Sequence, residues 1–308
     1  MPASTARYEL LRDRVERFTR LLHRVEDGDV DAVHRTRVAS RRLRELLPVL
    51  QLDADETEKL GRRLRKVTEY LGAVRELDVL LQVIQELGET GAYQDAPLER
   101  VAANVRDERD RARARLMAKL PKTELDRLVA KLGKAADVIE AADAVTRPRA
   151  EKPRSWRWAI DARVARRAAA VLSAMASAGT VYLPERLHAV RISAKKLRYA
   201  LEVAADTSHQ KSRADLTQLR RMQDSLGRLH DLQVLVERVR QVQASLTPPD
   251  VTAWREMDRL IASLEDECRR LHGRYMRGRD GLAELCTRRA GHGAELKPEK
   301  VKAKRTAR

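Results

Sequence analysis

Residues 34–44 read "HRTRVASRRLR", and residues 188–198 read "HAVRISAKKLR". In both, a histidine is followed by an arginine three residues later, an aliphatic residue, two adjacent basic residues, a leucine and a further arginine. A second pair of stretches, "LGAVRELDVLL" at 71–81 and "LGRLHDLQVLV" at 226–236, recurs in the same order. The separation is 154 residues for the first pair and 155 for the second. The sequence therefore predicts a tandem internal duplication.

Apolar residues recur at intervals of three and four along nearly the whole chain, as at Leu60, Leu64, Val67 and Leu71. This period is typical of amphipathic helices, and no segment shows a convincing strand alternation. Breaks are expected at 26–31, after Pro48, at 88–97 and at Pro121. The fold class predicted is all-α. A tandem repeat of about four helices suggests paired helical bundles.

The predicted domain boundaries follow the breaks in this pattern. The first bundle covers 1–146, and the proline-containing stretch "RPRAEKPRS" at 147–155 is a linker. The second bundle covers 156–290, with Pro184 in the first turn of its motif helix. The remaining residues, 291–308, are basic, lack apolar periodicity and are expected to be disordered.

The chain carries 63 Lys and Arg against 46 Asp and Glu, a formal net charge of +17. Such a surplus predicts attraction to polyanions, namely nucleic acid, anionic membranes or polyphosphate. Aromatic residues make up only 3% of the chain, which argues against proteins that stack single-stranded bases on aromatic rings. Cys268 and Cys286 are expected to be free thiols in a reducing compartment. No apolar signal core or membrane-spanning run is evident, so we expect a soluble, cytoplasmic protein without membrane insertion.

Each repeated motif places its basic residues on one side of a helix and its leucines on the other. At about 100° per residue, one face of the first motif gathers His34, Arg37, Arg41 and Arg44, opposite Leu43, Leu46, Leu47 and Leu50. The second motif gathers His188, Arg191, Lys195 and Arg198, opposite Leu197 and Leu201. Arg42 and Lys196 fall roughly 80° from the histidine, at the flank of each ridge. The pattern predicts two helices with an apolar floor and a cationic ridge.

Like charges three or four residues apart weaken a helix by a few tenths of a kcal/mol per pair. Three interpretations of the ridges are possible: they are solvated helix faces, they are neutralised by acidic neighbours, or they bind an anion. Because the ridge occurs twice, anion binding is favoured. Metal binding by the histidines is disfavoured, because fixed cations surround each of them. Two roles remain open for His34 and His188: donating to phosphate, or fixing the start of the helix. No glycine-rich phosphate loop, G-x-S-x-G or H-E-x-x-H motif occurs, and no catalytic residue, metal ligand or cofactor is predicted.

The two motifs and their downstream partners resemble the CHAD domain, the conserved-histidine α-helical domain, over nearly the whole chain up to about residue 290. The resemblance implies two four-helix bundles related by pseudo-twofold symmetry, with the motif helices lining a positively charged groove or pore. It further implies that the ligand is inorganic polyphosphate and that binding occurs without catalysis. Some family members carry a CYTH triphosphatase module. No Glu-x-Glu-x-Lys signature precedes the motifs here, so we expect a stand-alone binding protein.

The resemblance assigns ligand binding to the matching positions of both motifs: His34, Arg37, Arg41, Arg42, Arg44, His188, Arg191, Lys195, Lys196, Arg198 and Tyr199. Further basic residues near the ridges are weaker matches: Arg65, Lys66, Arg75, Arg220, Arg221 and His230. The two copies also differ from the family pattern and from each other. Glu45 stands where the second copy has Tyr199, Glu76 replaces the expected aspartate, and His230 replaces the expected arginine.

Three functions remain as hypotheses. The first is non-enzymatic polyphosphate binding, in the cytoplasm and in association with polyphosphate or storage granules. The second is general nucleic-acid binding, for which the net charge alone would provide weak affinity. The third is a phosphohydrolase, for which the sequence offers no recognisable catalytic motif.

Overall fold

The computed structural model describes residues 6–26, 29–119, 121–145, 156–207, 213–246 and 250–294. Within these ranges the chain forms nine α-helices and one 3₁₀ turn, and no strand, so the predicted all-α class is confirmed. The elements are α1 (Arg7–Glu26), α2 (Val30–Leu46), η1 (Leu47–Val49), α3 (Ala54–Glu89), α4 (Asp95–Lys119), α5 (Lys122–Val145), α6 (Trp156–Ala178), α7 (Pro184–Thr207), α8 (Arg213–Ala244) and α9 (Val251–Ala294).

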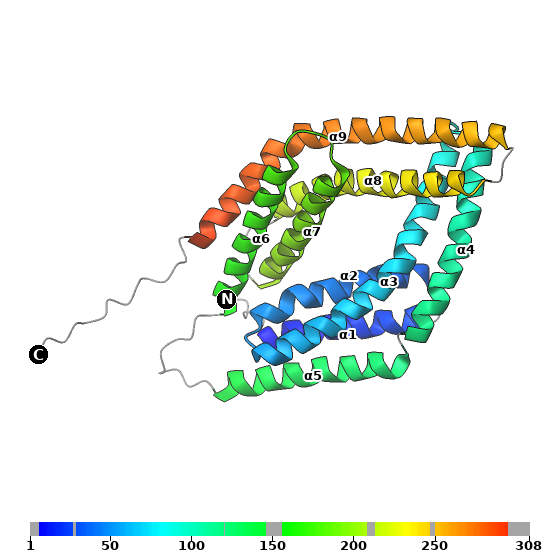
Figure 1. Ribbon diagram of the computed structural model, residues 1–308. Helices are drawn as coiled ribbons and strands as arrows, with labels where there is room; N and C mark the ends of the chain where they lie inside the picture. Colours follow the sequence, from blue (N-terminus) through cyan, green and yellow to red (C-terminus); the bar gives the residue numbers. More distant parts are fainter. Residues whose placement is uncertain are drawn as a thin grey trace, which may run out of the picture.

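The helices are arranged as a four-sided frame (Figure 1). Along one side α8 packs on α9, and along the opposite side α1 packs on both α2 and α5. The other two sides are formed by α3 with α4 and by α6 with α7. Contacts between α2 and α7, and of α3 and α4 with α8, join the first part of the chain to the second. The motif helices thus lie inside the frame, where the two parts meet.

The helix boundaries follow from local chemistry. Asp29 caps α2 by accepting a hydrogen bond from the backbone N–H of Ala32, and Asp53 caps α3 in the same way. The motif helix α2 stops at Leu46 because Pro48 follows, and the chain tightens into η1. Pro184 is the first residue of α7, where its missing N–H costs no helical hydrogen bond.

Leucine and valine side chains form a continuous core through the frame. On α2 and the η1 turn that follows it, the predicted floor residues Leu43, Leu46, Leu47 and Leu50 are at most 1% exposed. Leu197 and Leu201 on α7 are buried to the same degree. Full burial of a leucine side chain contributes about 1.5–3 kcal/mol, so these floors hold the two cationic ridges in place.

A polar contact recurs where each motif helix packs on the helix that follows it. The hydroxyl oxygens of Ser40 on α2 and Thr68 on α3 lie 2.8 Å apart. At the equivalent place on α7 and α8, Gln223 donates to the backbone carbonyl of Ala194 over 2.8 Å. The same junction is therefore satisfied by two hydroxyls in one repeat and by an amide and a carbonyl in the other.

The two repeats differ in their helix count. Five α-helices, rather than the predicted four, are described up to residue 145, whereas four follow it. The reason is Pro121, which separates α4 from α5, while α9 runs unbroken over the corresponding part of the second repeat. Helix α9 continues to Ala294 and so includes residues 291–294 of the predicted tail. The predicted linker at 147–155 and the rest of the tail lie outside the described residues.

Candidate functional site

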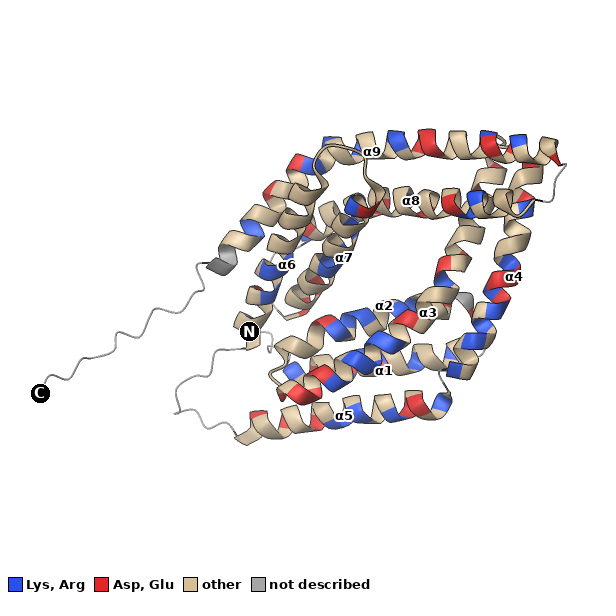
Figure 2. Ribbon diagram, viewed as in Figure 1, with Lys and Arg blue, Asp and Glu red and all other residues tan. Residues whose placement is uncertain are grey.

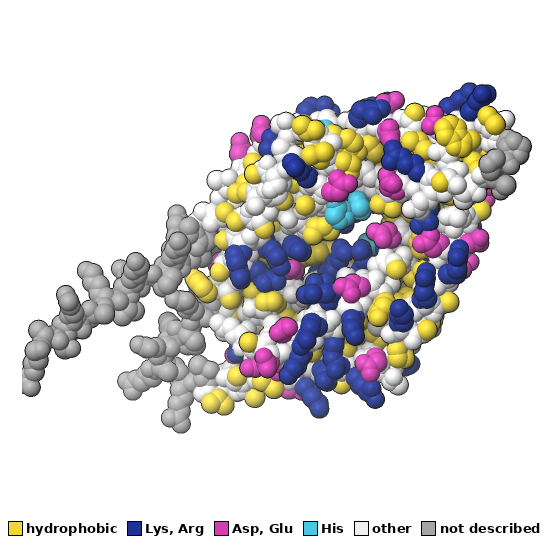
Figure 3. Space-filling view, viewed as in Figure 1, with side chains coloured by type: hydrophobic (Ala, Val, Ile, Leu, Met, Phe, Trp, Pro, Cys, Tyr) yellow, Lys and Arg dark blue, Asp and Glu magenta, His cyan; other side chains and the backbone are white. Residues whose placement is uncertain are grey.

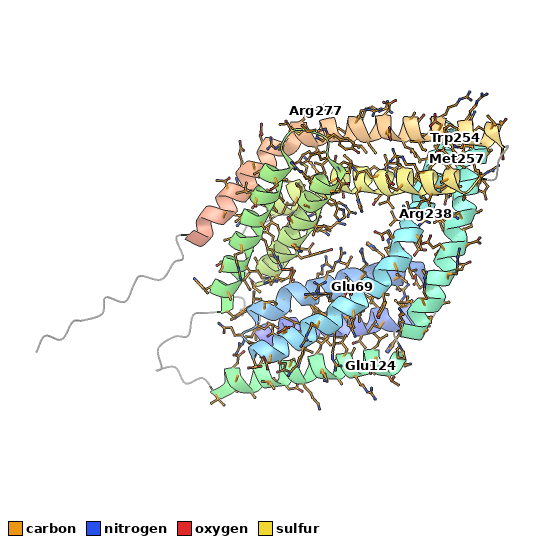
Figure 4. All side chains as sticks on the ribbon, viewed as in Figure 1. Glu69, Glu124, Arg238, Trp254, Met257 and Arg277 are labelled. Carbon is orange, nitrogen blue, oxygen red and sulfur yellow. The ribbon has the colours of Figure 1, made fainter. Side chains whose placement is uncertain are left out.

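A cavity of about 340 Å³ lies between the two motif helices, α2 and α7, and their partners α3 and α8. Its walls carry His34, Arg37, Arg41, Arg75, Glu76, Val79, Leu80, His188, Arg191, Ile192, Lys195, His230, Asp231 and Val234. Figure 3 shows an opening on this face, with a histidine side chain at one edge and lysine and arginine side chains at the other. Side chains of all four helices project into this space (Figure 4).

Most of the wall is built from equivalent positions of the two repeats. Pairs of lining residues are 154 residues apart on α2 and α7, and 155 apart on α3 and α8. The pairs are His34 with His188, Arg37 with Arg191, Arg41 with Lys195, Arg75 with His230, Glu76 with Asp231, and Val79 with Val234. Each half of the chain therefore contributes a nearly matching set of donors to one shared space.

Several cations in the cavity have no anionic partner. Among the described residues, Arg37, Arg41, Arg75 and Lys195 form no ion pair, whereas Arg191 lies 3.7 Å from Asp231. No acceptor in the described part of the chain lies within hydrogen-bond distance of the buried Nε atoms of Arg37, Arg75 and Arg191. A buried donor left unsatisfied costs about 1–3 kcal/mol. These N–H groups are therefore free to donate hydrogen bonds to a ligand that enters the cavity.

The crowding of positive charge alters the protonation of these groups. Burial, with the nearby charges of Arg191 and Arg41, lowers the pKa of Lys195 to about 7. Burial and the charge of Arg41 lower the pKa of Arg37 to about 10. An anion entering the cavity would relieve this repulsion and stabilise the charged forms.

The guanidinium of Arg37 lies flat against α3 at Gly72. A Cβ at residue 72 would stand 3.4 Å from Nε and 3.5 Å from Nη2 of Arg37. At the equivalent Gly227 of the second repeat, nothing lies within 4 Å of such a Cβ. A Cβ at residue 72 would therefore be in van der Waals contact with the guanidinium of Arg37, and a larger side chain would reach into the space that Arg37 occupies.

A family model for the CHAD domain matches residues 9–240. The chain belongs to the CHAD domain family. Its fold is similar to the crystal structure of the CHAD domain from the plant Ricinus communis, with a TM-score of 0.63 and 24% sequence identity over 90% of this chain and 93% of that one. It is also similar to PptA from Streptomyces chartreusis, with a TM-score of 0.56 and 20% identity over 88% of this chain and 96% of that one. No curated protein sequence matches the chain.

The histidines of this CHAD domain do not fix the starts of their helices. Asp29 caps α2, and His34 lies in the second turn, at the cavity. His188 instead meets His230 of α8, with their Nδ1 atoms 3.2 Å apart. Burial and neighbouring arginine charges lower the pKa of His34, of His188 and, to about 3, of His230. The three rings are therefore neutral near pH 7 in the absence of an anion.

Two carboxylates also face the CHAD cavity, and the motif analysis did not assign them to the site. Glu76 and Asp231 occupy equivalent positions on α3 and α8. Burial raises the pKa of Asp231 against the opposing effect of Arg191. The signal that could have found them is the second sequence repeat, in which an acidic residue follows Arg75 in one copy and His230 in the other.

Arg42 and Arg198, both predicted to bind ligand, lie outside the CHAD cavity and share one carboxylate. Arg42 donates through Nε to Glu202 over 2.8 Å, and Arg198 lies 3.8 Å from the other oxygen of Glu202. Arg42 lines a second, larger cavity of about 790 Å³ bordered by α1, α2, α7 and α8, and His34 lines both cavities. In the larger cavity Arg14 is also paired, with Asp206 at 2.6 Å. Carboxylates of α7 thus pair with Arg14 and Arg42.

The remaining predicted residues lie outside the cavity, some buried and some exposed. Tyr199 is only 4% exposed, and its ring lies beneath the guanidinium of Arg198 at 5.0 Å. Arg44 and Lys196 lie beyond Arg41, towards α6, whereas Arg65 and Lys66 are exposed on α3. Arg220 borders the larger cavity, and Arg221 is exposed on α8. The structure brings together eight of the predicted residues: His34, Arg37, Arg41, Arg75, His188, Arg191, Lys195 and His230.

No group of three or more His, Cys, Asp or Glu side chains in the described ranges could hold a metal ion. No helix there is long and apolar enough to cross a membrane. Cys268 and Cys286 are both buried free thiols.

Proposed function

We propose that this CHAD domain binds inorganic polyphosphate, without hydrolysing it, in the cavity between α2 and α7. The observation that carries the proposal is the set of unpaired cationic donors in one enclosed space. Arg37, Arg41, Arg75 and Lys195 line the cavity and form no ion pair with the described residues. Glu76 and Asp231 face the same space but are fewer than the cations, and burying the remaining positive charge is costly unless a ligand supplies the opposite charge.

Polyphosphate matches this set of donors chemically. It is an unbranched chain with about one negative charge per phosphate and has no bases to be read. Guanidinium groups bind phosphate oxygens through paired hydrogen bonds, and the ammonium of Lys195 acts as a compact point charge. Because the donors come from both repeats, a chain in the cavity would be contacted from opposite sides.

Nucleic acid fits the cavity less well than polyphosphate. Binding of single strands usually relies on bases stacked on aromatic rings, and the cavity is lined by no phenylalanine, tyrosine or tryptophan. A duplex, whose major groove alone is about 12 Å wide, is too broad for a space of about 340 Å³. General attraction to nucleic acid would instead arise from the net charge of +17.

One observation favours hydrolysis as a second candidate function. Asp231 is a cavity carboxylate whose pKa is raised by burial, and such groups serve as general bases in some enzymes. Its proximity to Arg191, 3.7 Å away, supports a positioning role instead. Release of orthophosphate from polyphosphate in the presence of magnesium or manganese, abolished in Asp231→Asn, would establish the enzymatic alternative.

Calorimetric titration with long-chain polyphosphate tests the binding proposal. We expect Arg37→Ala/Arg41→Ala/Arg191→Ala/Lys195→Ala to lower the affinity at least a hundredfold. The matched control removes four exposed cations elsewhere: Arg111, Lys131, Arg255 and Arg259. Equal losses in the two variants would show that only net charge matters. Displacement of polyphosphate by duplex DNA at comparable phosphate concentration would favour the nucleic-acid hypothesis.

A further inference from the structure

Uncompensated positive charge continues from the cavity onto α6. We call this surface the flanking patch, and its cations are Arg44, Arg65, Arg163, Arg166, Arg167 and Lys196. It begins at Arg41 in the cavity wall. Burial, followed by the charges of Arg65 and Arg41, lowers the pKa of Arg44, which places Arg44 next to both. The flanking patch is thus contiguous with the cavity.

Glu45 holds the α6 side of the flanking patch in place. Its carboxylate, 9% exposed, accepts hydrogen bonds from Arg163 at 2.8 Å and from Arg167 at 2.7 Å. These contacts join α2 to α6 across more than a hundred residues of sequence. Because one carboxylate pairs with two guanidinium groups, Glu45, Arg163 and Arg167 together keep a net positive charge.

The other cations of the flanking patch lack ion-pair partners among the described residues. Arg65, Arg166 and Lys196 are exposed, and Arg44 is partly buried. Burial and the charges of Arg167, Arg44 and Arg163 lower the pKa of Lys196, although Glu45 opposes them. These cations therefore repel one another in the absence of a ligand. Glu69 of α3, labelled in Figure 4, is the other carboxylate near Arg44.

The opposite side of the cavity carries a smaller surplus, because four carboxylates line the larger cavity there beside five arginines. There Arg14 and Arg42 are each paired, with Asp206 and Glu202 respectively. In Figure 3, lysine and arginine side chains form a continuous cluster from the opening towards the side of the frame that contains α6. Figure 2 shows that these charges belong to the halves of α6 and α7 that face α2. The surplus of positive charge therefore lies on the side of the cavity that faces α6.

We propose that the flanking patch is a second polyphosphate subsite, occupied by the part of a long chain that extends beyond the cavity. This inference rests on the proposed function, and it adds a role for Arg163, Arg166 and Arg167, which the repeated motifs do not include. A chain anchored in the cavity would reach the flanking patch at high effective concentration, so its affinity would increase with length. Tripolyphosphate would occupy the cavity alone.

The test compares tripolyphosphate with long-chain polyphosphate by calorimetry at one ionic strength. Arg166→Glu reverses a charge in the flanking patch without breaking an ion pair. Arg259→Glu, at an exposed position of α9, makes the same change in net charge as a matched control. We expect Arg166→Glu to lower long-chain affinity about tenfold and to leave tripolyphosphate affinity unchanged. Glu69→Gln, which removes a negative charge beside Arg44, should raise long-chain affinity severalfold.

Each outcome separates the inference from the function on which it rests. If Arg166→Glu and Arg259→Glu lower long-chain affinity equally, the subsite is overturned while cavity binding stands. A parallel loss of tripolyphosphate affinity in Arg166→Glu would also overturn it, because the effect would then be general electrostatics. If the wild-type protein binds neither ligand, both the proposed function and the subsite are wrong.

Discussion

The Nδ1 atoms of His188 and His230 lie 3.2 Å apart, and their ring centroids are separated by 4.3 Å. At that distance one ring donates its Nδ1 proton and the other accepts it, so two imidazolium rings would place two donors face to face. Burial and the charge of Arg191 add to this penalty, and the pKa of His230 falls to about 3. The pair therefore favours the neutral state of both rings.

This pair should make the stability of the unliganded protein depend on pH. An unfolded histidine takes up a proton near pH 6.5, whereas folded His230 resists it down to about pH 3. The unfolded state binds more protons in that window, so the free energy of unfolding decreases as the pH falls. We expect His230→Gln to remove part of this decrease, seen as a narrowing Tm difference from wild type between pH 7 and 4.5. His23→Gln, at an exposed position, is the control, and a pH-independent difference for His230→Gln would contradict the prediction.

Lys195 should couple polyphosphate binding to proton uptake. Its pKa is lowered to about 7 by burial and the neighbouring arginines, so a large fraction of the side chain is neutral near pH 7–8. A bound polyanion favours the ammonium form, and affinity should therefore decrease by up to tenfold per unit from pH 7 to 9. Calorimetry in two buffers of different ionisation enthalpy would measure the protons taken up. Lys195→Arg should bind with little proton uptake, and the same uptake in both proteins would assign it to another group.

Gly72 and Gly227 offer a matched pair of substitutions on α3 and α8. A leucine at 72 would push against the guanidinium of Arg37, whereas the space around a Cβ at 227 is open. Both substitutions replace a helical glycine by a good helix former, worth up to about 0.8–1 kcal/mol. We expect Gly72→Leu to lower tripolyphosphate affinity severalfold and Gly227→Leu to leave it unchanged. Similar affinities for the two variants would mean that Arg37 does not contribute to binding from its observed position.

Removing the charge of Glu45 should destabilise the protein. Glu45→Gln leaves the guanidinium groups of Arg163 and Arg167, 14% and 26% exposed, without their counter-charge. We expect a loss of about 2–3 kcal/mol in the free energy of unfolding, measured by urea denaturation. Glu140→Gln, which removes a solvent-exposed partner of Arg12, should cost less than about 0.5 kcal/mol. Long-chain polyphosphate should raise the free energy of unfolding of Glu45→Gln more than that of wild type. Equal free energies of unfolding for Glu45→Gln and Glu140→Gln would refute the role of Glu45.

Helical periodicity predicted the all-α class because apolar residues recur at intervals of three and four along the helices, and a cap or a proline marks the start of several of them. The same reasoning placed Arg42 and Lys196 at the flank of their ridges, and the structure puts both outside the cavity. It also placed Arg44 and Arg198 on the ridge face, yet these lie a turn further along and meet other partners. A helical wheel gives the direction of a side chain but not where along the helix a cavity ends.

The contacts that distinguish one arginine from another could not be predicted from the sequence. Arg42 is neutralised by Glu202, 160 residues away, and Glu45 is contacted by Arg163, 118 residues away. Both pairings depend on how α2 packs against α6 and α7, which no local pattern encodes. Glu76 and Asp231 were missed for a related reason: only the packing of α3 and α8 brings them to the cavity.

A dimer of identical chains around a twofold axis would build such a cavity from two copies of every wall residue, because a symmetric interface uses each residue twice. Any exchange of one side chain would then alter both walls at once. With both repeats in one chain, Arg41 can face Lys195, and Arg75 can face His230. The α7–α8 wall gives up part of its positive charge as Lys195 loses its proton near pH 7. Covalent linkage of the two repeats thus allows one wall of the cavity to carry a lysine that titrates near pH 7 at a position where the other wall carries an arginine.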